Sequence, residues 1–163
     1  IYDHRIHHRR TDVPGDPHSP WFFGEKALSG WKGLLHAHCL WLFRERLPIR
    51  SALVREFEAD PVLRRLDSWS PLIAAGSVLV PGLLGALYEG TARGVLLGAL
   101  WGGCVRMFAL NHIVWAVNSF GHRFGTRNPH DRTQARNNRL LGLLAFGDGW
   151  HSNHHAAPFA ARH

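Results

Sequence analysis

The chain has 163 residues, is 45% hydrophobic, contains 13 histidines and carries a formal net charge of +7. This length allows one domain at most. Cys39 and Cys104 stand alone without a C-x-x-C pair, so the sequence supports neither a zinc ribbon nor a disulfide framework. The Glu-x-x-His pairs of soluble di-iron bundles are also missing.

The first ten residues, IYDHRIHHRR, place three histidines at helical spacing. His4 lies three residues before His7 and four before His8, so on a helix both pairs share one face. Neutral imidazole is the commonest side-chain ligand of mid-row transition metals. A solvated basic run or the stub of an affinity tag is the alternative, although a tag would have consecutive histidines. From this segment alone, metal binding and these two alternatives together are about equally supported.

The next segments connect this helix to the apolar part of the chain. TDVPGDPHSP is typical of a turn-rich loop. GWKGLLHAHCLWLF is amphipathic at near-helical spacing, which indicates a helix that lies in a membrane interface. Within it, His36 and His38 lack the H-x-x-H-H spacing, so we expect them behind metal ligands rather than as ligands. Residues 50–66 are expected to form a short charged surface helix.

Two apolar segments follow, Pro71–Tyr88 and Val95–Val117, separated only by Glu89–Gly94. Each is long enough to span or nearly span a hydrocarbon core of about 30 Å. The alternative is a buried helical hairpin of a soluble protein. Glycine and proline inside both segments, together with Trp101 and Trp115, favour a transmembrane hairpin.

The basic residues predict the orientation of this hairpin. Residues 1–69 hold 11 lysines and arginines and residues 119–163 hold 6, whereas the connecting loop holds only Arg93. By the positive-inside bias, both long flanking segments are cytoplasmic and the loop is external. Arg106 lies inside the second apolar segment, where a charge is costly, so it should face a partner or a cavity.

The C-terminal part repeats the histidine pattern. GDGWHSNHHAAP places His151, His154 and His155 at the same H-x-x-H-H spacing, and WAVNSFGH supplies Asn118 and His122 four residues apart at the end of the second span. Seven histidines on three segments outnumber the four ligands of a tetrahedral zinc. They suit two metal ions with open positions.

Three of these segments resemble motifs of the membrane fatty acid desaturases of the acyl-CoA delta-9 type. DHRIHHRRTDVPGDPHSP resembles their second histidine box and following loop, NSFGHRFGTRNP the segment before the third box, and FGDGWHSNHHAAP the third box. The resemblance covers nearly the whole chain. It implies an all-α integral membrane fold, in which a transmembrane helical hairpin is joined to a cytoplasmic helical cap that carries the histidine boxes.

On this resemblance, residues 1–163 are the C-terminal part of a single desaturase domain. Residues 1–69 would be cytoplasmic with the second box and the interfacial helix, residues 70–118 would form two transmembrane helices, and residues 119–163 would be cytoplasmic with the third box. The family has a first box, H-x-x-x-x-H, and two further spans upstream. We therefore expect this chain to be a fragment that is inactive by itself.

The resemblance also implies a di-iron centre that uses O2 as co-substrate. The implied metal-binding residues, with the asparagine acting through a water, are His4, His7, His8, His122, His151, His154, His155 and Asn118. Electrons would come from a donor protein of the ferredoxin, rubredoxin or cytochrome b5 type with its reductase, because the sequence has no flavin, haem or Fe–S motif. Nucleic acid is not an expected partner.

The implied reaction is the introduction of a cis double bond, at the delta-9 position, into a long acyl chain carried by CoA or by a lipid. Trp115 and Val114 fall where the family's acyl tunnel bends, although the family has threonine at the valine position. Asp3, Arg44 and Arg46 fall where contacts to CoA are expected.

Asp148 stands where the family usually has glutamate, and it would be a shorter carboxylate behind a metal ligand. A related di-iron membrane hydroxylase is an alternative function, because hydrogen abstraction is common to both reactions. A non-catalytic metal-binding membrane protein is the other alternative.

Overall fold

The computed structural model describes residues 1–44 and 51–160. The chain divides into two compact units. One consists of Ile1–Ile49 and His112–His163 and is called the histidine unit below; the other, Arg50–Asn111, is called the hairpin unit.

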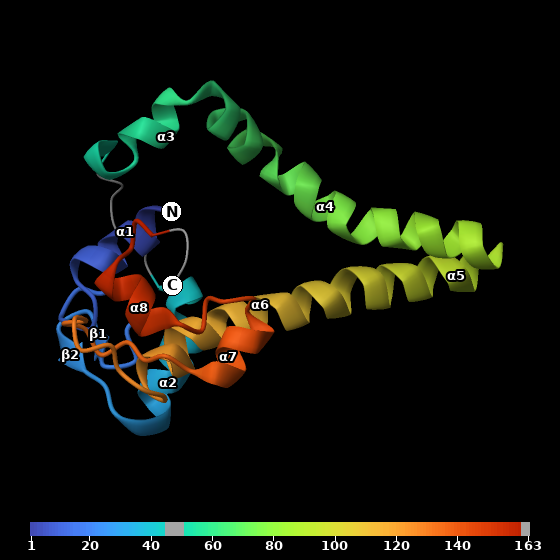
Figure 1. Ribbon diagram of the computed structural model, residues 1–163. Helices are drawn as coiled ribbons and strands as arrows, with labels where there is room; N and C mark the ends of the chain where they lie inside the picture. The colour runs from blue at the N-terminus through green and yellow to red at the C-terminus, as the bar shows by residue number, and fades with distance from the viewer. Residues whose placement is uncertain (45–50, 161–163) are drawn as a thin grey trace. The chain divides into compact units, whose positions relative to one another are not determined.

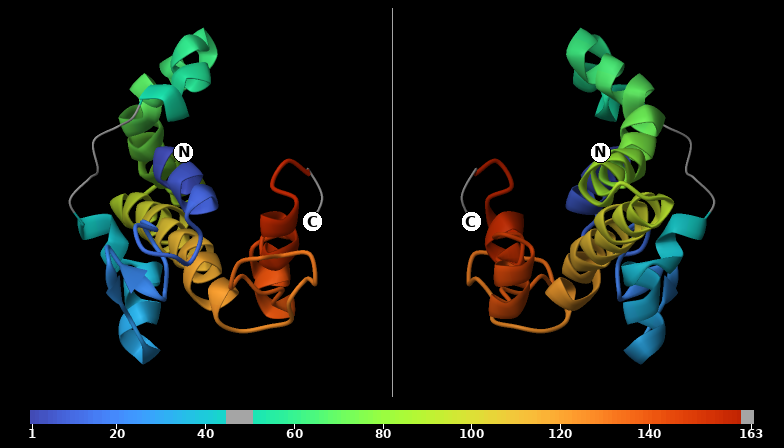
Figure 2. Two further views of the ribbon diagram at one scale, coloured as in Figure 1. Left: turned by 90° about the vertical axis from the view of Figure 1, so that its left-hand side faces the viewer. Right: turned by 90° about the vertical axis from the view of Figure 1, so that its right-hand side faces the viewer.

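The N-terminal part of the histidine unit is helical with one small hairpin (Figures 1 and 2). In chain order it contains α1 (Tyr2–Arg9), β1 (Phe22–Phe23), β2 (Lys26–Ala27), α2 (Gly30–His38) and the 3-10 helix η1 (Leu40–Phe43). β1 and β2 pair antiparallel across a turn in which Gly24 has a φ of +58°. This hairpin departs from the all-α prediction, and Phe23 packs its ring 5.0 Å from that of His36 in α2.

The C-terminal part of this unit contains the end of α6 (Arg106–Ser119), the 3-10 helix η4 (Phe120–His122), α7 (Arg139–Leu144) and α8 (His151–Ala156). The Asn138 side chain caps α7 by accepting from the backbone N–H of Leu141. Asn153, on α8, accepts from the side-chain amides of Asn128 and Asn137, each at 2.9 Å. α8 is therefore attached to the preceding loop by side-chain hydrogen bonds.

The interior of the histidine unit is unusually polar. Its largest fully buried side chains are His7 and His122, and the buried hydrophobic residues around them are few and mostly small, such as Ala37 and Ala135. Polar groups withdrawn from water are costly unless they are paired. The histidines therefore need partners inside the unit, and these define the candidate site.

The hairpin unit consists of the 3-10 helix η2 (Ser51–Leu53), α3 (Arg55–Ala59), α4 (Pro61–Glu89), α5 (Ala92–Leu97), the π-helix η3 (Gly98–Val105) and the first turns of α6. The charged helix expected over residues 50–66 is divided between α3 and α4. Asp60 caps α4 by accepting from the backbone N–H groups of Val62 and Leu63, and Pro61 occupies the first turn. α4 therefore begins ten residues before the apolar segment and, with 29 residues, is about 44 Å long.

Glycines allow α4 to pack closely against α5 and η3. A Cβ placed on Gly85 would collide with the backbone carbonyl of Gly94, and one on Gly98 would collide with the carbonyl of Pro81. Small residues at helix contacts let two backbones approach each other in this way. A larger side chain at these positions would separate the two arms of the hairpin.

Arg106 forms a link between the two arms. Its Nε donates to the carbonyl of Gly102 at 2.7 Å, and its Nη2 donates to the carbonyl of Ser77 at 3.0 Å. Ser77 lies four residues before Pro81, which has no N–H to donate to that carbonyl. The arginine thus donates to a carbonyl that Pro81 leaves without its helical donor. The partner expected for Arg106 is therefore the backbone of both arms.

Two helical stretches, Pro61–Glu89 and Ala92–His122, are long and apolar enough to span a membrane. Only 6% and 11% of their most apolar windows are buried inside the structure. Core helices of soluble proteins bury such faces, so these stretches are compatible with lipid exposure.

Candidate metal centre

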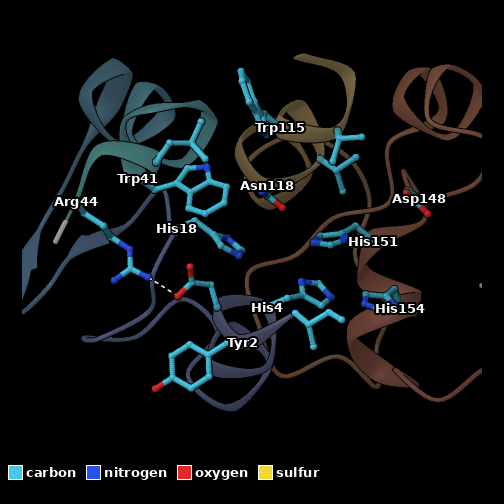
Figure 3. Close-up of a pocket in the computed structure, with 15 residues that line it drawn as sticks. Tyr2, His4, His18, Trp41, Arg44, Trp115, Asn118, Asp148, His151 and His154 are labelled. Carbon is cyan, nitrogen blue, oxygen red and sulfur yellow. Dashed lines mark hydrogen bonds and ion pairs between the residues drawn. The ribbon is translucent and has the colours of Figure 1, made fainter. Parts of the chain in front are cut away.

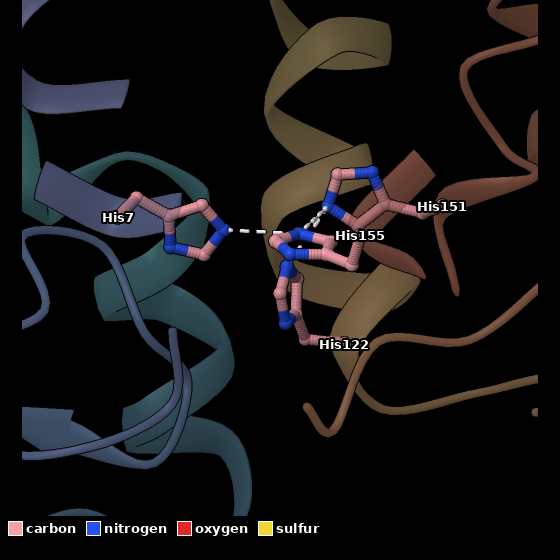
Figure 4. Close-up of side chains that lie close together, drawn as sticks. All are labelled: His7, His122, His151 and His155. Atoms are coloured by element: carbon pink, nitrogen blue, oxygen red, sulfur yellow. Dashed lines mark hydrogen bonds between the residues drawn. The ribbon is translucent and has the colours of Figure 1, made fainter. Parts of the chain in front are cut away.

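All seven histidines of the H-x-x-H-H segments and η4 lie in two adjacent groups, of which Figure 4 draws the larger. The ligand atoms within each group are all within 4.8 Å of one another. The deep group comprises His7, His122, His151 and His155, and the outer group comprises His4, His8 and His154.

Two short helices and one 3-10 turn supply these groups. α1 and α8 each present histidines from one face, as the H-x-x-H-H spacing predicts, and η4 supplies His122 between them. The rings of His8 and His155 stack at 4.6 Å, so the two groups adjoin. The deep group is largely buried, whereas His4 in the outer group is exposed.

Two aspartates from the loop after α1 accept hydrogen bonds from Nδ1 of two histidines of the deep group. His7 Nδ1 lies 2.9 Å from Asp16 Oδ2, and His122 Nδ1 lies 2.8 Å from Asp12 Oδ2. A carboxylate accepts hydrogen bonds, so each imidazole donates from Nδ1 and turns its Nε2 toward the group. Carboxylates placed behind histidines in this way fix the ring orientation in metal sites.

The tautomers of these rings test whether the deep group fits a cation. As neutral rings, His7 and His122 carry lone pairs on Nε2. The Nε2 contacts run from His122 to His151 (2.9 Å), on to His155 (3.1 Å) and then to His7 (3.2 Å). With lone pairs at both ends, protons can satisfy at most two of these three contacts. A metal ion would accept every lone pair, so this residue set fits a bound metal.

Burial favours the neutral, metal-binding form of four of these histidines, His7, His8, His151 and His155. Desolvation, followed by the charge of His122, lowers the pKa of His7, His151 and His155 well below the ordinary value. Desolvation, with the neighbouring His4, also lowers the pKa of His8 to about 4. At neutral pH these imidazoles offer lone pairs without first having to lose a proton.

The two aspartates differ in their electrostatics. Burial by itself raises the pKa of Asp12, but the charge and hydrogen bond of His122 outweigh it and leave that pKa below its usual value. Burial raises the pKa of Asp16, opposed by the charge of His18. Asp12 is therefore the more firmly ionised partner.

A cavity of about 690 Å³ opens beside the outer group (Figure 3). Its apolar lining, called the apolar wall below, includes Trp41, Val114 and Trp115, and its histidine lining, called the histidine floor, includes His4, His151 and His154. Asn118 and Asp148 also line it. The structure thus brings Val114, Trp115 and Asn118 to one cavity next to the histidines.

Asp3 and Arg44 lie at this cavity and pair with each other. Arg44 Nη2 donates to Asp3 Oδ1 at 2.6 Å, and both residues line the cavity wall. Arg46, the third residue expected to contact substrate, lies outside the described residues.

His36 and His38 lie elsewhere than expected. His38 contacts Ser119 and His112, and His36 lines an apolar groove along α2 with Phe23 and Trp31. Among the described residues, Asp12 and Asp16 hydrogen-bond the deep histidines from behind instead. Asp148 is near enough to His4 for its charge to oppose the lowering of the His4 pKa by burial and by the N-terminal amine.

Three residues of the turn-rich loop, Asp12, Asp16 and His18, lie at the site without having been predicted there. His18 is buried, its ring lies 4.2 Å from that of His7, and its Nδ1 has no hydrogen-bond partner among residues 1–44 and 51–160. Loop residues have no periodicity that shows which way they face. The available signal was the presence of two carboxylates and an imidazole directly after a histidine-bearing helix.

A family model described as fatty acid desaturase matches residues 1–163. The chain is 36% identical to a hex-5-enoyl-[acyl-carrier protein] acetylenase from Moorena producens, over 93% of this chain and 48% of that protein. It is 32% identical to an acyl-CoA C20 Delta5-desaturase from Anemone leveillei, over 100% and 47%. It is 31% identical to an sn-1 stearoyl-lipid 9-desaturase from Synechocystis, over 98% and 45%. The chain thus spans about half the length of these relatives.

Proposed function

Because this chain belongs to the fatty acid desaturase family, we propose that its two histidine groups hold a di-iron centre for the O2-dependent desaturation of a long acyl chain. The product would have a cis double bond, and the substrate we favour is an acyl-CoA desaturated at the delta-9 position. Relatives are named for substrates on acyl-carrier protein, CoA and lipid. Since the chain spans about half the length of these relatives, the activity is proposed for the full-length gene product.

One observation carries the proposal: imidazole nitrogens from α1, η4 and α8 converge beside a cavity with an apolar wall. We assign one iron to the deep group and one to the outer group, with Asn118 acting on the centre through a water. Iron held there would supply the O2 chemistry needed to take hydrogen from an unactivated methylene, with electrons from the donor protein.

The chain's own residues would position both reaction partners. Asp12 and Asp16 hold the imidazoles of His122 and His7 so that Nε2 points inward. The apolar wall shields the methylenes of an acyl chain from water, and its distance from the histidine floor decides which methylene lies near the metal. We place Asp148 as a carboxylate acting near His4 on the cavity side.

The carrier would bind at the mouth of the cavity. Arg44 is held by Asp3 and is available to phosphate oxygens, and Arg46 follows it closely in the chain. Two electrons per turnover would come from a donor protein of the ferredoxin, rubredoxin or cytochrome b5 type.

The membrane topology belongs to the same proposal. We propose that residues 70–118 cross the membrane twice and that residues 1–69 and 119–163, with both histidine segments, are cytoplasmic. Trp31 on α2 is 68% exposed and Phe43 on η1 is 82% exposed. Such exposed aromatic side chains are typical of a helix that lies in the lipid interface.

The test is metal and product analysis of the purified full-length gene product. We expect two irons per chain, and oleoyl-CoA from stearoyl-CoA when O2, a reductase and a donor protein are supplied. One tightly held zinc without iron would refute the di-iron centre. A hydroxylated product would show that the protein is a hydroxylase instead. If chains linked to CoA, lipid and carrier protein all give no product, the protein only binds metal.

A further inference from the structure

A second pair of histidines lies outside the two metal groups. His38, the last residue of α2, places its Nε2 2.9 Å from Nδ1 of His112 on α6. Its Nδ1 lies 3.1 Å from the hydroxyl of Ser119, which is fully buried. Neither histidine belongs to a metal-binding group in the described residues.

The hydrogen bonds of this pair have a consistent direction that ends at Trp115. The Ser119 hydroxyl donates to the backbone carbonyl of Trp115 at 3.0 Å, so it is left to accept from His38 Nδ1. His38 Nε2 is then an acceptor, and His112 donates to it from Nδ1. His112, His38 and Ser119 thereby form a chain of three donors that ends at the Trp115 carbonyl, the acceptor.

The same two imidazoles pack against the indole of Trp115. The ring of His112 lies 5.0 Å from that of Trp115 at 69°, and the ring of His38 lies 6.2 Å away at 85°. Trp115 also lines the cavity beside Asn118 (Figure 3). The pair therefore contacts the indole of a residue that lines the cavity.

We propose that His38 and His112 are positioning residues that fix Trp115 in the cavity wall and so determine which methylene of an acyl chain lies against the metal groups. This inference rests on the proposed function. Two apolar residues could fill the same space, but they would leave the oxygen of the buried Ser119 without the N–H that His38 supplies. A role in specificity therefore accounts for the imidazoles better than packing does.

The experiment compares His112→Leu with His112→Gln in the full-length gene product. Leucine keeps the bulk but removes the donor to His38, whereas glutamine retains an N–H. The matched control is His130→Leu, because His130 is exposed in the loop before α7. For each variant, iron per chain, double-bond position and chain-length preference are measured, together with the binding of saturated fatty acids of several lengths without reductant.

We expect His112→Leu to keep its iron and to change the ratio of products or of chain lengths by about tenfold, the usual discrimination for a one-methylene difference. Glutamine should restore most of the wild-type profile, and His130→Leu should leave it unchanged. An unchanged profile in His112→Leu, or a change accompanied by equal loss of iron, would overturn the inference. If the wild-type protein makes no unsaturated product, the proposed function fails, while the fatty acid binding preference still decides whether the pair shapes the cavity.

Discussion

The carboxylate of Asp12 joins three separate segments of the chain. Its Oδ2 accepts from His122 Nδ1 at 2.8 Å and from the backbone N–H of Gln134 at 3.0 Å, and its Oδ1 accepts from Ser19 Oγ at 3.1 Å. All three are donors, and a carboxylate has acceptor positions for all of them. The orientation of His122 therefore depends on a residue far from it in sequence.

We predict that Asp12→Asn weakens metal binding by about 10- to 100-fold, the usual effect of removing a carboxylate behind a ligating histidine. The asparagine side chain would place its NH2 group against one of the three donors that the Asp12 carboxylate accepts from, so at least one of these hydrogen bonds would be lost. Metal affinity is measured by competition with a chelator. The control is Asp67→Asn, which removes an exposed carboxylate on α4; an equal loss in both variants would contradict the role of Asp12.

We predict that His122→Ala abolishes desaturation and reduces bound iron, whereas His130→Ala leaves both close to wild type. His122 is fully buried in the deep group, and His130 is exposed in a loop. Iron content and product yield are measured on the same preparations. Comparable losses in both variants would show that the metal site lies elsewhere.

The H-x-x-H-H spacing predicted which histidines share one face of each short helix, whereas His122 lies outside both segments and was included by its position at the end of the second span and by the family resemblance. The spacing could not predict what holds them. Asp12 and His122 are 110 residues apart, and periodicity carries no information between elements so distant. For the same reason His38 was expected behind the metal ligands, although its partners lie on α6.

Among the elements, the contact of α4 with α5 and η3 depends on close backbone approach. We predict that Gly85→Ala destabilises the hairpin by about 1–3 kcal/mol, the usual cost of overpacking, because its Cβ would meet the carbonyl of Gly94. Gly76→Ala is the matched control on the same helix, since nothing lies within 4 Å of its Cβ position. Thermal unfolding in detergent is the measurement, and equal midpoints for the two variants would contradict this packing.

The start of α4 shows why composition alone misplaced an element boundary. The charged residues before Pro71 suggested a separate surface helix. The Asp60 cap followed by Pro61 instead begins a helix that continues through Pro71 and Pro81. Local capping decides where a helix starts, whereas hydrophobicity decides only which part of it can enter a membrane.

For the whole molecule, the proposed topology places the Glu89–Gly94 turn outside the cell. We predict that Thr91→Cys, in a background with Cys39 and Cys104 replaced by serine, reacts with an impermeant thiol reagent in intact cells. Phe146→Cys should react only after lysis; Phe146 is 96% exposed, so lack of access within the protein would not explain its protection. Labelling of Phe146→Cys but not Thr91→Cys in intact cells would reverse the orientation.

At this scale the sequence predicted the mostly helical fold and the two apolar helices, because both follow from long runs of similar residues. The small β1–β2 hairpin escaped prediction, since two residues per strand give no alternating pattern to detect. The cavity next to the histidines is lined by residues of α1, η1, α6 and α8 together. Periodicity within one element could not predict it; only the family resemblance had suggested that single residues of these elements lie near a substrate.

The bond from Arg106 to the carbonyl of Ser77 also constrains how sequences of this kind diverge. While Pro81 is present, losing the arginine leaves a carbonyl without a donor in apolar surroundings. Once proline is replaced by a residue with an N–H, the helix supplies its own donor, and selection no longer retains a costly charge in the second apolar helix. We therefore expect lineages to lose the proline before the arginine, so that aligned relatives with proline at 81 but no donor at 106 are the rarest combination.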